Sequence, residues 1–168
     1  MRPIVNRFLS LVFIPGVFLL AVASCSKSNN SGSSSGMSAT VGSNSWSSGA
    51  SATQGIDDTS QDQFEIGGTQ INGGDTTAFI LYFSTLFTVG RAMNSDTVFV
   101  DVNYIDSKTL NLYDGGKEAG WSILTVTSYN SSGHTIAGTF NGVLYNLSNS
   151  SDSLVISNGK FNSSYTVQ

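Results

Sequence analysis

The stretch "GWSILTVTSYNSSGHTIAGTFNGVLYNL", residues 120–147, decides the fold class. Within residues 121–129, apolar and polar side chains alternate with the period of two that is typical of a β-strand. Residues 130–134 form a polar segment of hairpin length, and the alternation resumes over residues 135–145. The stretch therefore predicts two antiparallel strands joined by a short loop.

Shorter patterns of the same kind extend in both directions. Upstream, "MSATVGSNSW" (37–46) predicts a small hairpin, and further strands are predicted in "QFEIGG", "TTAFILYFST", "TVFVDVNYI" and "TLNLYDG". Downstream, "SNSSDS" (148–153) predicts a turn, and "NGKF" (158–161) predicts a bulge or turn before a final strand over residues 161–167. The span "STLFTVGRAMNS" (84–95) fits a brief helix or a loop equally well.

Gly, Ser, Thr and Asn are abundant between these strands, which favours tight turns over helices. Short strands spaced along the chain with turn residues between them indicate an all-β domain. We expect an antiparallel β-sandwich or partly open barrel of roughly 8–10 short strands.

Residues 1–24 have the pattern of a secretory signal. Arg2 and Arg7 supply a positive amino-terminal region, and residues 8–21 form an almost unbroken apolar run. The run is shorter than the roughly 20 apolar residues that a membrane-spanning helix needs. We therefore expect residues 1–24 to be removed from the mature protein.

The tetrapeptide Val22-Ala23-Ser24-Cys25 resembles a bacterial lipobox. The resemblance implies that the thiol of Cys25 carries a diacylglycerol, that the signal is cut before it, and that the new amino terminus is acylated. Two or more acyl chains hold a protein stably on a membrane. The alternative is an ordinary signal cut near Ala23, which would leave Cys25 as a free thiol.

Residues 25–36 follow as the lipidated cysteine and a Ser/Asn/Gly linker, and residues 37–168 form the predicted β domain. The sequence has no cysteine after Cys25, which excludes a disulfide or a cysteine-ligated metal in that domain. The chain has 7 Lys and Arg against 11 Asp and Glu, without a basic cluster. Binding to nucleic acid or electrostatic docking on anionic lipid is therefore not expected.

Three stretches of the β domain together resemble a family of small Bacteroidota lipoproteins, most of them domains of unknown function. They are "MSATVGSNSW" (37–46), "TIAGTFNGVLYN" (135–146) and "SLVISNGKF" (153–161). The resemblance implies an antiparallel β fold and a location in the cell envelope. It contributes no catalytic residue.

The same resemblance assigns structural roles to four residues. It implies that Gly138 and Gly159 are positions of close approach or bulges, and that Phe140 and Phe161 belong to the core. In such bacteria, acidic residues directly after the lipidated cysteine favour display on the cell surface, but residues 26–28 here are Ser-Lys-Ser. We therefore expect the protein to face the periplasm from the outer membrane.

Several acidic residues are candidates for chemistry. Asp57, Asp58, Asp62 and Glu65 could supply oxygen ligands to calcium, although their spacing matches no EF-hand and a solvated turn explains them as well. A second group, Asp96, Asp101 and Asp106, borders a predicted strand, and two converging carboxylates could hydrolyse glycosides. The strand alternation places Asp101 on a polar face, where solvent exposure is the simpler explanation.

His134 and the two tryptophans complete the candidates. His134 is the single histidine and lies in the predicted hairpin loop, and no G-x-S-x-G motif accompanies it. We therefore interpret it as a loop residue. Trp46 and Trp121 could stack on sugar rings, but their strand positions favour core packing for both.

These observations predict a lipid-anchored envelope lipoprotein whose β domain is a non-enzymatic binding or structural module. They point to no cofactor, metal ion or catalytic residue, and the membrane is engaged through Cys25. Three alternatives stay open: a glycan-binding accessory protein using Trp46 or Trp121, a small carboxylate-dependent hydrolase using Asp101, and a subunit that pairs an edge strand with a larger envelope protein.

Overall fold

The computed structural model describes residues 35–56, 62–117 and 119–168, which form eleven β-strands. The strands are β1 (Gly36–Val41), β2 (Asn44–Ser48), β3 (Ser51–Ile56), β4 (Asp62–Asn72), β5 (Asp75–Ser84), β6 (Ala92–Asn94), β7 (Val100–Asp106), β8 (Asn111–Asp114), β9 (Trp121–Asn130), β10 (Thr135–Asn146) and β11 (Asn149–Val167). The described residues include no helix that is long and apolar enough to cross a membrane. The predicted all-β class is confirmed.

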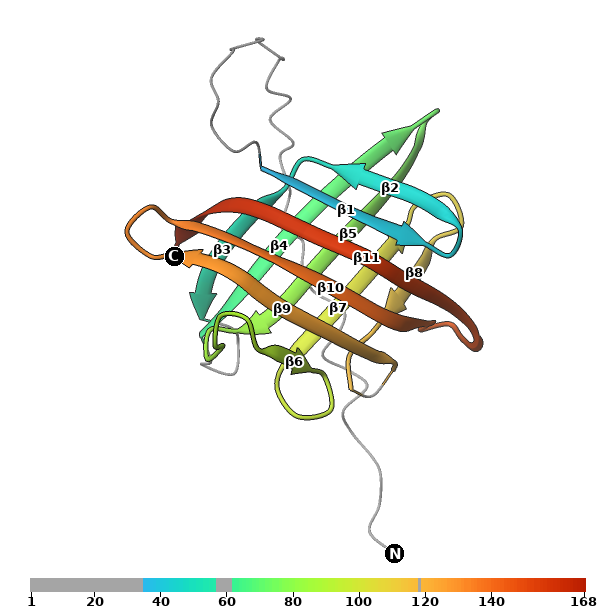
Figure 1. Cartoon of the computed structure of the whole chain (residues 1–168). Coiled ribbons are helices and arrows are strands. Elements are labelled where there is room, and N and C mark those ends of the chain that lie inside the picture. Colours follow the sequence, from blue (N-terminus) through green and yellow to red (C-terminus); the bar gives the residue numbers. More distant parts are fainter. Residues whose placement is uncertain (1–34, 57–61, 118) are drawn as a thin grey trace, which may run out of the picture. The chain divides into compact units, whose positions relative to one another are not determined.

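The strands form one continuous sheet that folds over into two layers. Its order is β2-β1-β11-β3-β4-β5-β7-β8-β10-β9-β6, with a further pairing of β11 to β10. In Figure 1, β1, β11, β10 and β9 lie in front of β3, β4, β5 and β7, and the two sets of strands cross. We call β2, β1, β11, β10, β9 and β6 the front layer, and β3, β4, β5, β7 and β8 the back layer.

Two short pairings join the layers at their sides. Residues 145–146 of β10 pair with residues 113–114 of β8 in antiparallel register. On the opposite side, residues 165–167 of β11 pair with residues 52–54 of β3, in parallel. Both junctions consist of only two or three residue pairs, so the sheet makes a partial ring and not a regular barrel.

A partly buried polar cluster supports the junction of β8 and β10. Asp152 Oδ2 accepts a hydrogen bond from the Tyr113 hydroxyl at 2.8 Å and another from Asn146 Nδ2 at 3.0 Å. The Asn146 side-chain oxygen accepts a third bond, from the backbone N–H of Ser148 at 2.9 Å. The bonds from Asn146 and Tyr113 lower the pKa of Asp152. This cluster ties β8 to the β10–β11 hairpin where the backbone pairing is shortest.

The core lies between the layers and consists mainly of aromatic and branched side chains. Phe79 of the back layer contacts Phe140 of the front layer, with ring centroids 5.5 Å apart, and Phe83 contacts Phe161 at 6.2 Å. The largest fully buried side chains are Phe64, Phe79, Phe83, Phe140, Ile66, Leu81, Leu124, Ile136, Leu144, Ile156, Val102 and Val126. Alternate residues of the long strands supply them, as the period of two requires.

Two glycines let strands and rings approach closely in the front layer. A Cβ on Gly138 would meet the backbone oxygen of Thr125 and lie 2.5 Å from the ring of Phe161. A Cβ on Gly159 would meet the backbone oxygen of Phe140 and lie 2.7 Å from its ring. The predicted close-approach role of both glycines and the core positions of Phe140 and Phe161 are therefore confirmed.

The carboxyl-terminal strand is longer than the sequence pattern predicted. A turn was expected over residues 148–153, but the chain turns at residues 147–148 and β11 then runs without a break to Val167. The polar residues 149–153 form strand because they pair with the end of β10 in an exposed hairpin. The predicted irregularity is a bulge in β11, marked by a shift of register and by Asn158 at a φ of 54°.

The remaining expectations concern the ends of the sheet. The predicted hairpin over residues 37–46 is confirmed as β1 and β2, and Gly42 takes a positive φ of 60° in its turn. The ambiguous span 84–95 is loop apart from Ser84, which ends β5, and the three-residue β6. The edge strands of the described sheet, β2 and β6, are thus short, which offers little length for pairing with another chain.

Candidate functional site

Trp46, a predicted ligand contact, lies in the core. Its side chain is only 4 % exposed, and its indole N–H donates a hydrogen bond of 2.8 Å to Thr77 Oγ1. The ring meets Phe79 edge to face, with centroids 4.8 Å apart. Core packing, which its strand position favoured, thus holds for Trp46, and the prediction of an aromatic ligand contact rests on Trp121.

Trp121, the first residue of β9, is 41 % exposed on the outward side of the front layer. Val143 of β10 lies directly opposite it, and Val155 of β11 lies opposite Val143. Val155 is 55 % exposed, and Tyr145 lies two residues beyond Val143 at 36 %. We call Trp121, Val143 and Val155 the apolar row. Core packing, which the sequence favoured for Trp121 as well, does not hold.

The rest of this outward side, which we call the front face, is almost uncharged. The strands of the front layer contain two charged residues, Asp152 and Lys160. Asp152 is engaged at the junction with β8, which leaves Lys160 as the charged side chain facing outward on these strands. Most outward neighbours carry hydroxyl or amide groups, namely Thr40, Thr125, Thr127, Thr139, Asn141 and Ser157, while Ile123 and Ala137 lie on the same side.

A shallow groove crosses the front face away from the apolar row. Its volume is about 420 Å³. Five strands line it, with Thr127 from β9, Thr139 from β10, Lys160 and Asn162 from β11 and Ser38 from β1, together with the end of β2. Gly138 adds no side chain to its floor. We call this the front groove, and its lining can both donate and accept hydrogen bonds.

A second groove, the acidic groove, has a volume of about 410 Å³ and lies beside the first residues of β7. Asp101, Asp114 and Gly116 line one side, and Phe99, which is 43 % exposed, lies on another. A Cβ on Gly116 would lie 3.0 Å from Asp114 Oδ1 and 3.3 Å from Asp101 Cγ. The two carboxyl groups therefore meet at Gly116, whose own N–H donates to Asp114 Oδ1 at 2.5 Å.

Burial and a neighbouring charge change the protonation of this pair. Burial raises the pKa of Asp101 to about 7, and the negative charge of Asp114 raises it in the same direction. Hydrogen bonds from the Asn103 side chain and the Val102 backbone act against this rise. Asp101 Oδ1 is covered and receives no hydrogen bond from the described residues. Near neutral pH the pair therefore keeps a proton that two isolated carboxyl groups would lose.

Tyr82 and Glu65 continue the acidic surface across the back layer. Tyr82 of β5 lies opposite Asp101, and Glu65 of β4 lies opposite Tyr82. Burial raises the pKa of Glu65. Burial followed by the charges of Glu65 and Asp101 raises the pKa of Tyr82. The outward side of the back layer is therefore acidic where the front face is neutral.

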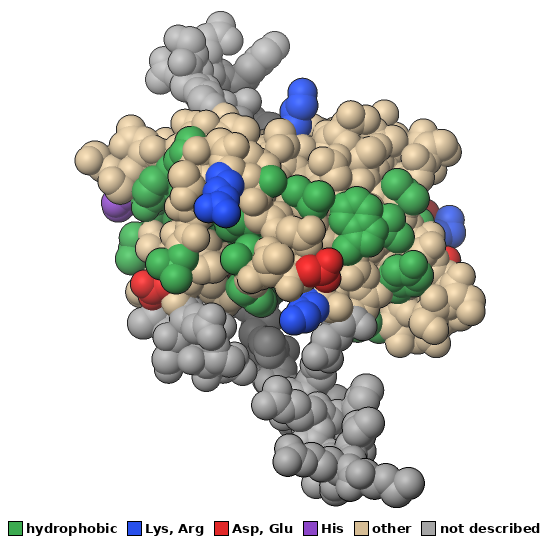
Figure 2. Space-filling view, turned by 60° about the horizontal axis from the view of Figure 1, so that its bottom comes forward, with side chains coloured by type: hydrophobic (Ala, Val, Ile, Leu, Met, Phe, Trp, Pro, Cys, Tyr) green, Lys and Arg blue, Asp and Glu red, His purple; other side chains and the backbone are tan. Residues whose placement is uncertain are grey.

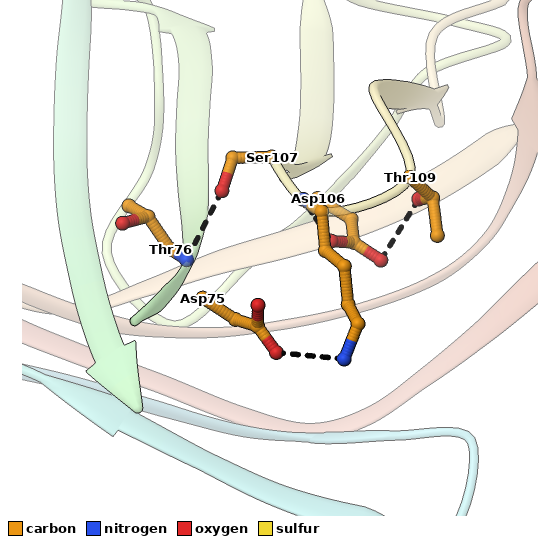
Figure 3. Close-up of polar contacts among 6 residues, drawn as sticks. Asp75, Thr76, Asp106, Ser107 and Thr109 are labelled. Atoms are coloured by element: carbon orange, nitrogen blue, oxygen red, sulfur yellow. Dashed lines mark hydrogen bonds and ion pairs between the residues drawn. The ribbon is translucent and has the colours of Figure 1, made fainter. Parts of the chain in front are cut away.

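The other predicted members of the Asp101 group do not pair with it. Asp96 lines the acidic groove, but Asp106 lies five residues along β7, about 16 Å away at the usual rise per residue. Asp106 is the last residue of β7 and accepts hydrogen bonds of 2.9 Å from the Lys108 N–H and from Thr109 Oγ1, both in the turn that follows (Figure 3). In the same turn Lys108 forms an exposed ion pair of 3.0 Å with Asp75. The converging partner of Asp101 is instead Asp114.

His134 has a structural position in the β9–β10 loop. It takes a positive φ of 48°, and its ring stacks on Tyr165 with centroids 5.2 Å apart. The backbone N–H of Tyr165 donates to its carbonyl oxygen at 2.8 Å, and the Tyr165 hydroxyl donates to the Tyr129 hydroxyl at 3.1 Å. These contacts agree with the interpretation of His134 as a loop residue.

Other predicted sites fall partly or wholly outside the described residues. Asp57, Asp58 and the lipidation site Cys25 lie there. Asp62 and Glu65 both lie on β4, but their odd spacing directs them to opposite sides of the strand. Among the described residues, no three His, Cys, Asp or Glu side chains group together as a metal site would require.

Residues 86–164 match the model of a family described as a domain of unknown function (DUF5025). This range is just under half of the chain, and it contains Trp121, Asp101 and Asp114. No curated protein and no solved structure matches the chain. The chain therefore carries a β-rich domain of unknown function, and its resemblance to the Bacteroidota lipoproteins stays a prediction.

Proposed function

We propose that this protein is a lipid-anchored, non-enzymatic binding module of a bacterial cell envelope, held by Cys25 on the outer membrane and facing the periplasm. The lipobox at residues 22–25 and the polar linker that follows support the anchor. The linker lets the β domain contact molecules near the membrane while the acyl chains keep it there.

The exposed apolar row carries the binding part of the proposal. An aromatic ring and two branched side chains lie in register on the surface, so their exposure follows from the strand pairing and not from a loop. Figure 2 shows one side of the molecule, on which hydrophobic side chains form several groups and a few charged side chains lie between them. Exposed apolar surface of this kind, with a polar surround, is typical of binding sites.

A small carboxylate-dependent hydrolase is the second candidate, because Asp101 and Asp114 converge in a groove. Glycoside hydrolases keep their two carboxyl groups at least about 5 Å apart. Asp101 and Asp114 instead approach one point at Gly116, where an added Cβ would lie 3.0 Å from Asp114 Oδ1 and 3.3 Å from Asp101 Cγ. We rank this candidate below the binding module for that reason.

The anchor is tested by a Cys25→Ser variant in the native host, with membrane fractionation and intact-mass analysis of the wild type. We expect the wild-type mass to include two or three acyl chains and the variant to leave the membrane. A soluble wild-type protein, cut near Ala23 and unmodified, would contradict the anchor.

The binding part is tested by photo-crosslinking in the same host. Benzoylphenylalanine replaces Val155, in the apolar row, or Leu110, which is 86 % exposed in the β7–β8 turn and serves as the control. We expect a discrete adduct of any chemical class at position 155 and none at position 110. Equal labelling at both positions would show that the row is ordinary surface.

A further inference from the structure

We propose that the front face binds an uncharged polysaccharide, which contacts the apolar row at Trp121 and continues toward the front groove. This inference rests on the proposed function and names the ligand class of the same surface. It is carried by three features: an exposed indole, a groove lined with hydroxyl and amide groups, and the near absence of charge on the strands between them.

The apolar row supplies a stacking surface. Trp121 is 41 % exposed at the first position of β9, and its cross-strand neighbours Val143 and Val155 extend the apolar area across three strands. The faces of sugar rings carry C–H groups, which pack on an aromatic ring, while their hydroxyl groups stay at the rim. A tryptophan presents a large area for such contact at a small cost in conformational entropy.

The front groove supplies hydrogen-bonding groups that match sugar hydroxyls. The hydroxyl groups of Ser38, Thr127 and Thr139 each donate and accept, as sugar hydroxyls do, and Lys160 adds a donor at the same groove. These side chains come from β1, β9, β10 and β11, so the sheet itself fixes their spacing. Sites built on strands hold such groups more rigidly than sites on loops.

Charge distinguishes this ligand from others. Only Asp152 and Lys160 are charged on the strands of the front layer, and Asp152 is held at the junction with β8. On these strands, an anionic ligand could pair with only one cation, Lys160. A cationic ligand would meet no outward-facing carboxylate. An uncharged polyol is not affected by this lack of charged side chains, because it is recognised by stacking and by hydrogen bonds between neutral groups.

The separation of the two features indicates a chain and not a single sugar. Val143 of the apolar row and Thr139 of the front groove are four residues apart on β10, a distance of about 13 Å at the usual rise per residue. Asn141 lies between them on the same side of the strand. An oligosaccharide spans that distance, and a monosaccharide does not.

The test uses the full mature lipoprotein in detergent and three probes: laminarin and galactomannan, which are uncharged, and polygalacturonate, which is anionic. Affinity electrophoresis and tryptophan fluorescence report binding, and Trp121 is the exposed one of the two tryptophans. We expect at least one uncharged polysaccharide to bind and polygalacturonate to bind more weakly. Trp121→Ala should weaken binding by about tenfold or more, and Trp121→Phe by less.

Two further variants separate the features. Thr139→Ala should weaken binding a few-fold, whereas Phe99→Ala, which removes an aromatic of similar exposure from the acidic groove, should leave it unchanged. If Trp121→Ala does not fold, the binding affinities of Trp121→Phe and Thr139→Ala test the inference instead. The inference is overturned if neither uncharged probe binds, if the anionic probe binds best, or if Trp121→Ala binds like the wild type.

The photo-crosslinking experiment distinguishes this inference from the proposed function. A protein adduct at position 155, or a dimer that Trp121→Ala converts to a monomer, would leave a binding module in place but overturn the polysaccharide as its ligand. Equal labelling at positions 155 and 110 would remove the binding module itself.

Discussion

The strands of the front layer contain one acidic and one basic residue, whereas the strands of the back layer contain six acidic residues and no basic one. The six are Asp62, Glu65, Asp75, Asp101, Asp106 and Asp114. Both layers supply inward side chains to the same core, so packing does not require this difference. Glu65, Asp101 and Asp114 occupy outward positions, which are free to vary in a strand, whereas Asp62, Asp75 and Asp106 are end residues of their strands. The difference teaches that the two surfaces are suited to different partners, and that the neutral one carries the exposed tryptophan.

The largest expected effect tests how tightly the front layer is packed. Gly159→Ala places a Cβ against the Phe140 backbone and ring, and should lower the free energy of unfolding by about 3 kcal/mol or prevent folding. Gly67→Ala in the back layer is the matched control, because its Cβ would lie 3.9 Å from its nearest neighbour, the Phe79 oxygen. Urea unfolding measures both variants. Similar losses for the two variants would show that Gly159 is not a position of close approach.

The next effect concerns the junction between the layers. Asn146→Ala removes a 95 % buried amide that donates to Asp152 and accepts from Ser148, and should cost about 2 kcal/mol. Asn149→Ala is the control, since Asn149 accepts a similar bond from Ser151 at an exposed position. Thermal unfolding compares the two variants. Equal stability would show that the cluster does not hold β8 to β10.

The acidic back layer should make stability depend on pH. Because the pKa of Asp101 is raised to about 7, the folded state keeps a proton that the unfolded state loses near pH 4. The associated stability is complete below about pH 4 and is lost as the pH rises through about 7.

The asparagine in Asp101→Asn has nearly the shape of a protonated aspartate and stays uncharged at every pH. The variant should therefore match the wild type at about pH 4, and exceed it by a growing margin as the pH rises, on the order of 2–4 kcal/mol at pH 8. Denaturant unfolding at several pH values measures the difference, with Asp96→Asn from the same groove as the control. A variant less stable than the wild type at pH 8 would disprove the shared proton.

The smallest effect is expected at the exposed end of the back layer. Asp75→Asn removes the ion pair with Lys108, whose two side chains are 45 % and 67 % exposed, respectively. Exposed pairs of this kind contribute little because solvent screens them. The melting temperature should therefore not change measurably in physiological salt. A clear loss would mean that back-layer carboxylates stabilise the fold even where they are exposed.

Local pattern predicted most of the strands because alternation is a property of neighbouring residues. The strands around residues 121–129 and 135–145 were confirmed for that reason, whereas the close-approach roles of Gly138 and Gly159 came from the family resemblance. The extent of β11 was not predicted, because its polar residues 149–153 read locally as a turn and are held in the strand by pairing with β10.

The candidate site was less predictable because it depends on pairing between distant strands. Alternation placed Asp101 on a polar face, but the meeting with Asp114 follows from the register of β7 and β8, which no local pattern encodes. Likewise, a strand position favoured burial of Trp121, yet the side chain is exposed because it lies outward at the start of β9. The sequence did contain a signal for this: Trp121 lies at odd spacings from Leu124 and Val126, so a strand directs its side chain to the opposite side from theirs.

The pairing of the first and last strands has a consequence for biosynthesis. β1 has β2 and β11 as its sheet neighbours, and β3 is joined to the front layer through the parallel pairing with residues 165–167. The front layer therefore lacks a central strand until residues 149–167 have been made. Such non-local closure is slow and late in folding. A nascent chain that lacks residues 149–167 therefore cannot complete its front layer while it is still being synthesised.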